Sequence, residues 1–194
     1  MMDTHNATPR VPFIVGVGGT TRAGSATERC LQLSLAHAQA LGARTLLVGG
    51  AQLPTEVYDP AVAQRSPQAQ ALVAALRKAD GIVLATPSYH GSLSGLMKNA
   101  LDFVEDLRTD ERVYLQDRAV GCIVCAEGPQ ALGSTLVALR SVVHALRAWP
   151  TPYGAALSRP FLADGRTSDP SVDEACQRVA HEVFSFAQRW ARPS

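Results

Sequence analysis

The chain has 194 residues, of which 46% are hydrophobic and 18% charged, and its net charge is +1. This size and composition predict one globular domain, residues 11–194, preceded by a flexible tail over residues 1–10. The near-neutral charge argues against nucleic acid or a membrane surface as the main target, and no apolar run reaches transmembrane length. The first ten residues are polar and do not resemble a signal peptide, so we expect a cytoplasmic protein.

Apolar runs and helical periodicities alternate along the chain. The predicted strands cover residues 11–18, 43–48, 81–86, 118–126 and 153–157. The predicted helices cover residues 25–41, 67–79, 96–107, 134–149 and 171–192. Five such strand–helix units predict an α/β three-layer sandwich, in which a five-stranded parallel sheet carries helices on both faces. The number of strands fits the flavodoxin-like order 2-1-3-4-5, whose ligands bind at the carboxyl ends of the first and third strands.

The first loop at this edge, residues 16–27, joins the first strand to the first helix and is rich in glycine and hydroxyl groups. Backbone N–H groups at a helix start attract anions. The side chains that can add donors for a phosphate group are Thr20, Arg22, Ser25 and Thr27. The loop lacks the lysine of a P-loop and the second strand lacks the terminal carboxylate of a Rossmann fold. A monophosphate therefore fits better than a triphosphate or a dinucleotide.

A simpler interpretation of this loop needs no ligand. Ser25 is followed three residues later by Glu28, which is the spacing of a capping box at a helix start.

The second loop, residues 87–95, follows the third strand. Tyr89 offers a flat face with a polar tip and Pro87 offers a rigid apolar surface. His90, Gly91 and Ser92 offer backbone N–H groups and little bulk, so a planar ring can lie close to the chain. A planar ring next to a monophosphate describes FMN. The third loop, residues 127–133, follows the fourth strand and completes the edge.

A hydrolase site in the second loop is not supported, although Ser88, Ser92, Ser94 and His90 crowd together there. A nucleophile elbow requires the pattern G-x-S-x-G, and Leu93 occupies its central position.

The cysteine pair Cys122 and Cys125 has the C-x-x-C spacing of redox or metal sites. Both residues belong to a predicted strand, however, where positions three apart point to opposite faces. We therefore expect buried free thiols, and no His/Cys cluster has the spacing of a structural zinc site.

Two stretches resemble the NADPH-dependent FMN reductase family. Residues 19–25, GTTRAGS, resemble its G-S-x-R-x-x-S loop, and residues 86–102, TPSYHGSLSGLMKNALD, resemble its T-P-x-Y-x-G-S-x-x-G-x-L-K-N-x-L-D stretch. The likeness extends over about residues 11–157 and is nearest to the reductases that serve sulfonate monooxygenases.

The resemblance implies an NAD(P)H-dependent FMN reductase that passes a hydride from NADPH to FMN N5, and then to free flavin, a quinone, an azo compound or a similar acceptor, in a ping-pong reaction. It implies a homodimer or tetramer, and a flavin-dependent monooxygenase as an optional partner. By position, the phosphate would be held by Thr20, Arg22, Ser25 and Thr27. The ring would be lined by Pro87, Ser88, Tyr89, His90, Gly91 and Ser92, and its pyrimidine end would face Ala126, Glu127 and Gly128. No catalytic side chain and no metal is required, because the flavin carries the chemistry.

Several alternatives stay open at this point. Glu127 departs from the family pattern, and its carboxylate points either toward the flavin or to solvent. NADH is an alternative to NADPH, with Arg22, Arg108 and Arg112 as candidate contacts for a 2′-phosphate. FMN is either a tight cofactor or a substrate that leaves. The alternative functions are a flavodoxin-type electron carrier, which the lack of strong acidity disfavours, and a non-catalytic flavin-binding protein.

Overall fold

The computed structural model describes residues 10–162 and 164–190. Residues 1–9 of the predicted tail, and the end of the predicted last helix at residues 191 and 192, lie outside this part. The strands are β1 Phe13–Gly18, β2 Arg44–Gly49, β3 Gly81–Tyr89, β4 Ser92–Leu93, β5 Ala119–Ala126 and β6 Trp149–Ser158. The α-helices are α1 Ala26–Ala40, α2 Pro67–Lys78, α3 Gly95–Asp102, α4 Leu132–Ala145 and α5 Pro170–Trp190. Short 3₁₀ turns are η1 Gly50–Gln52, η2 Phe103–Leu107 and η3 Pro129–Ala131.

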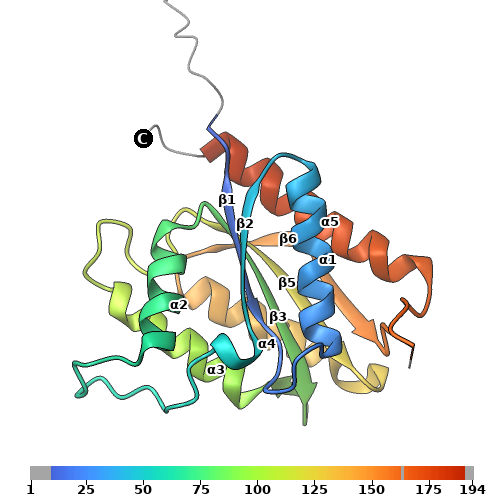
Figure 1. Ribbon diagram of the computed structural model, residues 1–194, viewed down its shortest axis with the longest axis horizontal. Helices are drawn as coiled ribbons and strands as arrows, with labels where there is room; N and C mark the ends of the chain where they lie inside the picture. The colour runs from blue at the N-terminus through green and yellow to red at the C-terminus, as the bar shows by residue number, and fades with distance from the viewer. Residues whose placement is uncertain (1–9, 163, 191–194) are drawn as a thin grey trace, which may run out of the picture.

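Five parallel strands form the sheet in the order β2-β1-β3-β5-β6, and the short β4 pairs antiparallel with the end of β3 (Figure 1). Counted along the chain, the parallel strands have the predicted order 2-1-3-4-5, so the flavodoxin-like prediction is confirmed. The strand β4 is an addition that the sequence analysis did not contain.

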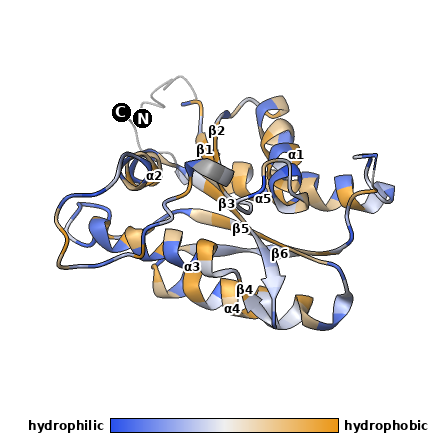
Figure 2. Cartoon of the chain, turned by 60° about the horizontal axis from the view of Figure 1, so that its bottom comes forward, coloured by the Kyte–Doolittle hydropathy of each residue, from blue (hydrophilic) through white to orange (hydrophobic). Residues whose placement is uncertain are grey.

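Each face of the sheet buries its own apolar core (Figure 2). One core lies between the sheet and the helices α2, α3 and α4, and the other lies between the sheet and the helices α1 and α5. Successive strand residues serve alternate cores: Ile14 faces α1 and α5, whereas Val15 faces α2. Burial on both faces explains why these strands read as continuous apolar runs.

The predicted fourth helix and fifth strand were wrong in their boundaries. Helix α4 ends at Ala145, and Trp149 is the first residue of β6. The helix cannot continue because Arg147 has a left-handed φ of +63°. Strand β6 holds Pro150 and Pro152, which the sequence analysis left outside the strand, and these prolines are tolerated because β6 is the outermost strand.

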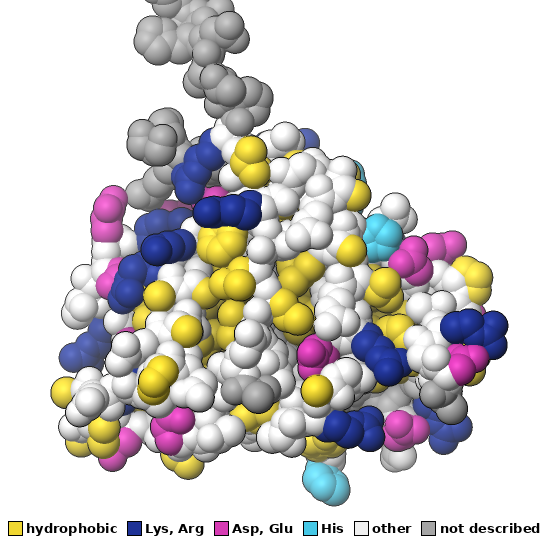
Figure 3. Space-filling model, in the orientation of Figure 1, with side chains coloured by type: hydrophobic (Ala, Val, Ile, Leu, Met, Phe, Trp, Pro, Cys, Tyr) yellow, Lys and Arg dark blue, Asp and Glu magenta, His cyan; other side chains and the backbone are white. Residues whose placement is uncertain are grey.

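The opposite edge strand, β2, faces the viewer in Figures 1 and 3. Figure 3 shows apolar side chains gathered along this strand between α2 and α1, and Leu46 of β2 is 41% exposed. No other strand in the described residues covers this edge. None of the described helices combines the length and the apolar character that a membrane span requires.

The four cysteines are free and buried, which confirms the prediction for Cys122 and Cys125. Cys122 faces one core and Cys125 the other, so the C-x-x-C pair is split by the sheet. The Cys125 thiol instead lies 3.7 Å from the sulfur of Cys30 on α1. Burial raises the pKa of Cys122 to about 12, which keeps this thiol protonated at neutral pH.

A buried arginine, Arg118, lies at the amino edge of the sheet, at the end opposite the predicted loops. Arg118 is 1% exposed and donates to the carbonyl oxygens of Arg77 at 2.8 Å and Ala79 at 2.9 Å, where α2 ends. Its guanidinium also bonds the carbonyl of Tyr114 at 3.1 Å. Burial, with the nearby charge of Arg112, lowers the pKa of Arg118 to about 10, so the group stays charged at neutral pH. The cation thus satisfies carbonyls that the helix end leaves unpaired.

We expect Arg118→Met to lower the free energy of unfolding by about 2 kcal/mol, because several buried carbonyls lose a charged donor while the methionine still fills the space of the stem. Urea unfolding measures this loss. The matched control is Arg77→Met, which removes an exposed ion pair with Asp110 and is expected to cost less than about 1 kcal/mol. Equal losses in the two variants would contradict the role assigned to Arg118.

Candidate functional site

The loops that follow β1, β3 and β5 lie at the carboxyl edge of the sheet, at the lower end of Figure 1. The first loop contacts β3, the strand that leads into the second loop, since the N–H of Gly19 donates to the carbonyl oxygen of Ala85 at 3.3 Å. The structure therefore brings the residues of the first and second predicted loops to one place, the switch point of the sheet.

The first loop is organised by its own hydroxyl groups. Thr20 Oγ1 accepts the N–H of Arg22 and donates to the carbonyl of the same residue, both at 3.2 Å. Ser25 caps α1, since its Oγ accepts the N–H of Glu28 at 3.4 Å. Ser25 and Thr27 are buried, whereas the exposed guanidinium of Arg22 makes no hydrogen bond or ion pair within the described residues. The loop thus presents an unpaired cation beside a helix start, which suits an anion.

Only half of the predicted capping box forms. The carboxylate of Glu28 does not return to the N–H of Ser25; it lies instead beside the backbone of Gly19 and Gly50. Its Oε2 is buried and has no hydrogen-bond partner among the described residues. A buried acceptor of this kind requires a donor from water or from a ligand. The sequence analysis missed this feature because it assigned the carboxylate to the cap.

The second loop is a β-hairpin rather than a strand-to-helix loop. Strand β3 continues past the predicted end at Thr86 to Tyr89 and turns through His90 and Gly91, with φ of +52° and +86°, into β4. Two consecutive residues with positive φ form the type I′ turn that matches the twist of a two-stranded ribbon. The hairpin extends the second loop outward from the sheet edge.

The hairpin is fixed to the start of α4. Ser88 Oγ bonds Thr135 Oγ1 at 2.7 Å, and Ser134 Oγ donates to the carbonyl of Gly91 at 3.1 Å. Ser88 is therefore used to hold the hairpin, and Pro87 is buried. The residues that remain exposed or half-exposed at this edge are Tyr89, His90, Gly91 and Ser92.

The end of β5 and the third loop that follows it contact Arg159, the residue directly after β6. The N–H of Arg159 donates to the carbonyl of Ala126 at 2.9 Å, and the Arg159 guanidinium lies 3.3 Å from the Glu127 carboxylate. The Glu127 side chain is 92% exposed. Of the two orientations that the sequence left open, the structure shows the one toward solvent.

Arg112 does not belong to this edge. Its guanidinium donates to the carbonyls of Ala79, Gln116 and Asp117, near the amino ends of β3 and β5. The proposed contact of Arg112 with a 2′-phosphate was therefore wrong, because sequence position alone did not reveal which end of the sheet it occupies.

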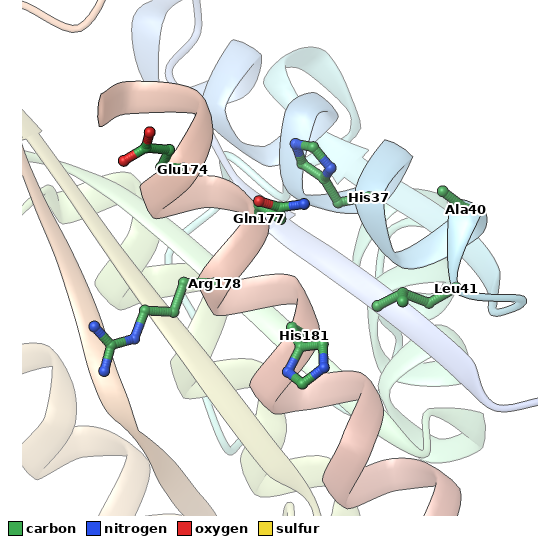
Figure 4. Close-up of a pocket in the computed structure, with 7 residues that line it drawn as sticks. All are labelled: His37, Ala40, Leu41, Glu174, Gln177, Arg178 and His181. Atoms are coloured by element: carbon green, nitrogen blue, oxygen red, sulfur yellow. The ribbon is translucent and has the colours of Figure 1, made fainter. Parts of the chain in front are cut away.

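Two cavities lie away from the three loops. One, of about 380 Å³, is a recess between α1 and α5, and Figure 4 shows His37 and His181 facing it from the two helices. A hydrogen bond between His37 Nε2 and Asp173 Oδ1, 3.0 Å long, bridges the same helices. The other cavity, about 320 Å³, lies at the amino edge beside Arg118. No group of three metal-type side chains is found in the described part of the chain.

The sequence profile of the NADPH-dependent FMN reductase family matches residues 12–160, which include all three loops. The chain belongs to this family. An NAD(P)H-dependent FMN reductase of Pseudomonas aeruginosa is 26% identical over 183 residues, covering 92% of this chain and 95% of the relative. An NADPH azoreductase of Bacillus sp. strain OY1-2 is 28% identical over 148 residues, covering 68% of this chain and 74% of the relative. Among solved structures, the flavoenzyme NAD(P)H:(acceptor) oxidoreductase FerB of Paracoccus denitrificans matches with a TM-score of 0.72 at 16% identity, covering 93% and 99% of the two chains.

Proposed function

We propose that this protein is an NAD(P)H-dependent FMN reductase that uses FMN at the carboxyl edge of the sheet. The observation that carries the proposal is the family match over residues 12–160, which spans the whole edge. The local chemistry supports it, since Arg22, which has no ion-pair partner among the described residues, lies beside the start of α1 and suits the phosphate of FMN. The orphan oxygen of Glu28 also fits a ligand that carries hydroxyl donors next to its phosphate.

In this proposal the first loop binds the phosphate through Thr20, Arg22, Ser25 and Thr27. The hairpin residues Tyr89, His90, Gly91 and Ser92 line the ring with Pro87 beneath them, and Ser88 holds the hairpin to α4. The backbone of Ala126, Glu127 and Gly128 borders the pyrimidine end. The Glu127 carboxylate takes no part in ring binding, because it is solvated and paired with Arg159.

The chain's contribution to the reaction is binding and orientation. When bound, FMN accepts a hydride from NAD(P)H and delivers electrons to an acceptor. The first loop neutralises the phosphate, and the rigid hairpin fixes the plane in which the ring lies. No side chain is required to take or give a proton, so substitutions at this edge act through affinity and orientation.

The finer features follow from the family resemblance and are part of the proposal. The acceptor is a small molecule, such as an azo compound, a quinone or free flavin, and a flavin-dependent monooxygenase is an optional partner. We propose a homodimer or tetramer, with residues 11–194 acting as one domain. A cytoplasmic location stays a prediction from the sequence.

Two measurements on the purified protein test the function. The visible spectrum before and after desalting shows whether FMN is bound, and NADPH or NADH oxidation with added FMN and an azo or quinone acceptor shows turnover. A flavin band that survives desalting identifies a resident cofactor, whereas turnover only with added FMN identifies a dissociating one. Flavin binding without NAD(P)H oxidation would favour the carrier or the non-catalytic alternative. Neither binding nor turnover would refute the proposal.

A further inference from the structure

The side chain of Asn99, on α3, holds a segment that has no regular secondary structure. Its Oδ1 accepts the N–H of Tyr58 at 2.9 Å, and its Nδ2 donates to the carbonyls of Pro54 at 3.2 Å and Glu56 at 2.8 Å. One amide thus binds three backbone groups of residues 54–58 and uses both of its N–H bonds. Asn99 belongs to the family-like stretch 86–102, but the binding of FMN assigns it no role.

Independent contacts fix the same segment on its outer side. The ring of Tyr58 packs edge-on against Phe103, with ring centroids 5.2 Å apart. Arg65 lies over Tyr58 at 4.6 Å and pairs with both carboxylate oxygens of Asp106, at 2.7 and 2.8 Å. Between these anchors Val57 is 84% exposed. Residues 54–58 are therefore held in one place, while the side chains of residues 55–57 stay open to solvent.

The segment of residues 54–58 lies close in the chain to η1, which borders the first loop on the side of β2. It begins just after η1, and a Cβ on Gly19 of the phosphate loop would lie 3.4 Å from the Gly50 nitrogen of η1. It ends against α3, whose N-cap Ser94 directly follows the hairpin. In Figure 1 this stretch runs along the lower end of the molecule, as do the first and second loops. Long irregular loops that are held this firmly at a ligand edge are commonly functional.

We propose that Asn99 is a positioning residue that holds residues 54–58 as a wall of the space where NAD(P)H and the electron acceptor dock. This inference rests on the proposed function. The phosphate loop is held by its own internal hydrogen bonds. The wall therefore affects the binding of NAD(P)H and of the acceptor rather than the binding of FMN. In a ping-pong reaction the donor and the acceptor occupy the same space in turn. Loosening the wall therefore weakens the binding of both.

The test uses the full-length protein with Asn99→Ala and Asn99→Asp. Alanine removes all three hydrogen bonds, and aspartate removes both donors and sets a carboxylate against two carbonyl oxygens. We expect KM for NADPH and for an azo or quinone acceptor to rise roughly fivefold to tenfold, with kcat changed less than about twofold and FMN affinity unchanged. Amide exchange of residues 54–58 should become faster in the alanine variant.

The matched control is Asp80→Ala, at the amino edge, where the buried carboxylate accepts the N–H of Phe13 at 2.9 Å. This variant should lose stability without any change in KM. Faster exchange of residues 54–58 with unchanged KM would overturn the proposal and leave Asn99 as a loop anchor. A KM rise of the same size in Asp80→Ala would also overturn it. A wild-type protein that neither binds FMN nor oxidises NADPH would instead refute the proposed function, before any variant is compared.

Discussion

Replacing Gly18 with alanine is expected to lower the free energy of unfolding by about 4 kcal/mol or more and to abolish FMN binding. A Cβ at this position would lie 1.9 Å from the carbonyl oxygen of Ala85, which is backbone and already accepts the N–H of Gly19. Gly18 also has a φ of +147°, which side-chain-bearing residues rarely adopt. Because β1 and β3 are buried neighbours, the clash can be relieved only by separating them at the switch point where the loops meet. Urea unfolding and flavin fluorescence titration measure the two losses.

Gly42→Ala is the control for backbone conformation alone. Gly42 follows α1 with a φ of +100°, and a Cβ there would meet nothing within 4 Å. Only the cost of the left-handed backbone applies, about 1 kcal/mol. If Gly18→Ala were as stable as Gly42→Ala, the close approach of β1 and β3 would not constrain the site as described.

The fold was predictable because its signals are local and repeated. Strand β3 is buried over residues 81–87 and reads as an apolar run over residues 81–85, and helix starts such as Ser25 and Ser66 carry capping side chains. The predicted ends of strands were wrong where the strands contain polar residues or proline. Strand β3 continues through Pro87 and Ser88 because β4 folds back on it and α4 supplies partners for Ser88. The contact of Ser88 with Thr135 joins residues 47 positions apart, so no local pattern contains it.

The membership of the candidate site was easier to predict than the direction of its side chains. The topology places the loops after β1, β3 and β5 at one edge whatever their side chains do. Whether Glu127 faces a ligand depends on Arg159, which lies 32 positions further along the chain, and Arg112 is assigned to an edge only by the carbonyls it reaches. Asn99 carried a usable signal, since asparagine is a poor residue for a helix interior and usually needs a partner there.

Ser25→Asp separates the two interpretations of the first loop, a helix cap or a phosphate site. Aspartate caps a helix as well as serine does and favours the helix dipole, so the helix start is kept and any loss of stability reflects the buried charge that the control variant below also carries. The affinity for FMN should fall about 100-fold or more, because two like charges about 4 Å apart near a protein surface repel by several kcal/mol. Riboflavin has no phosphate and should bind almost as it does to the wild type.

Ser94→Asp provides the matched control for that result. Ser25 and Ser94 are each 4% exposed, and Ser94 caps α3 by accepting the N–H of Met97 at 3.1 Å. The carboxylate in Ser94→Asp tests the cost of a buried charge at a helix start outside the phosphate loop. We expect the FMN affinity of this variant to change only a few-fold. If Ser25→Asp lost affinity for FMN and for riboflavin equally, the substitution would act by displacing α1 and not by repelling the phosphate. Selective loss of FMN would instead mean that the start of α1 contacts the phosphate itself, and that the serine serves both the helix and the ligand.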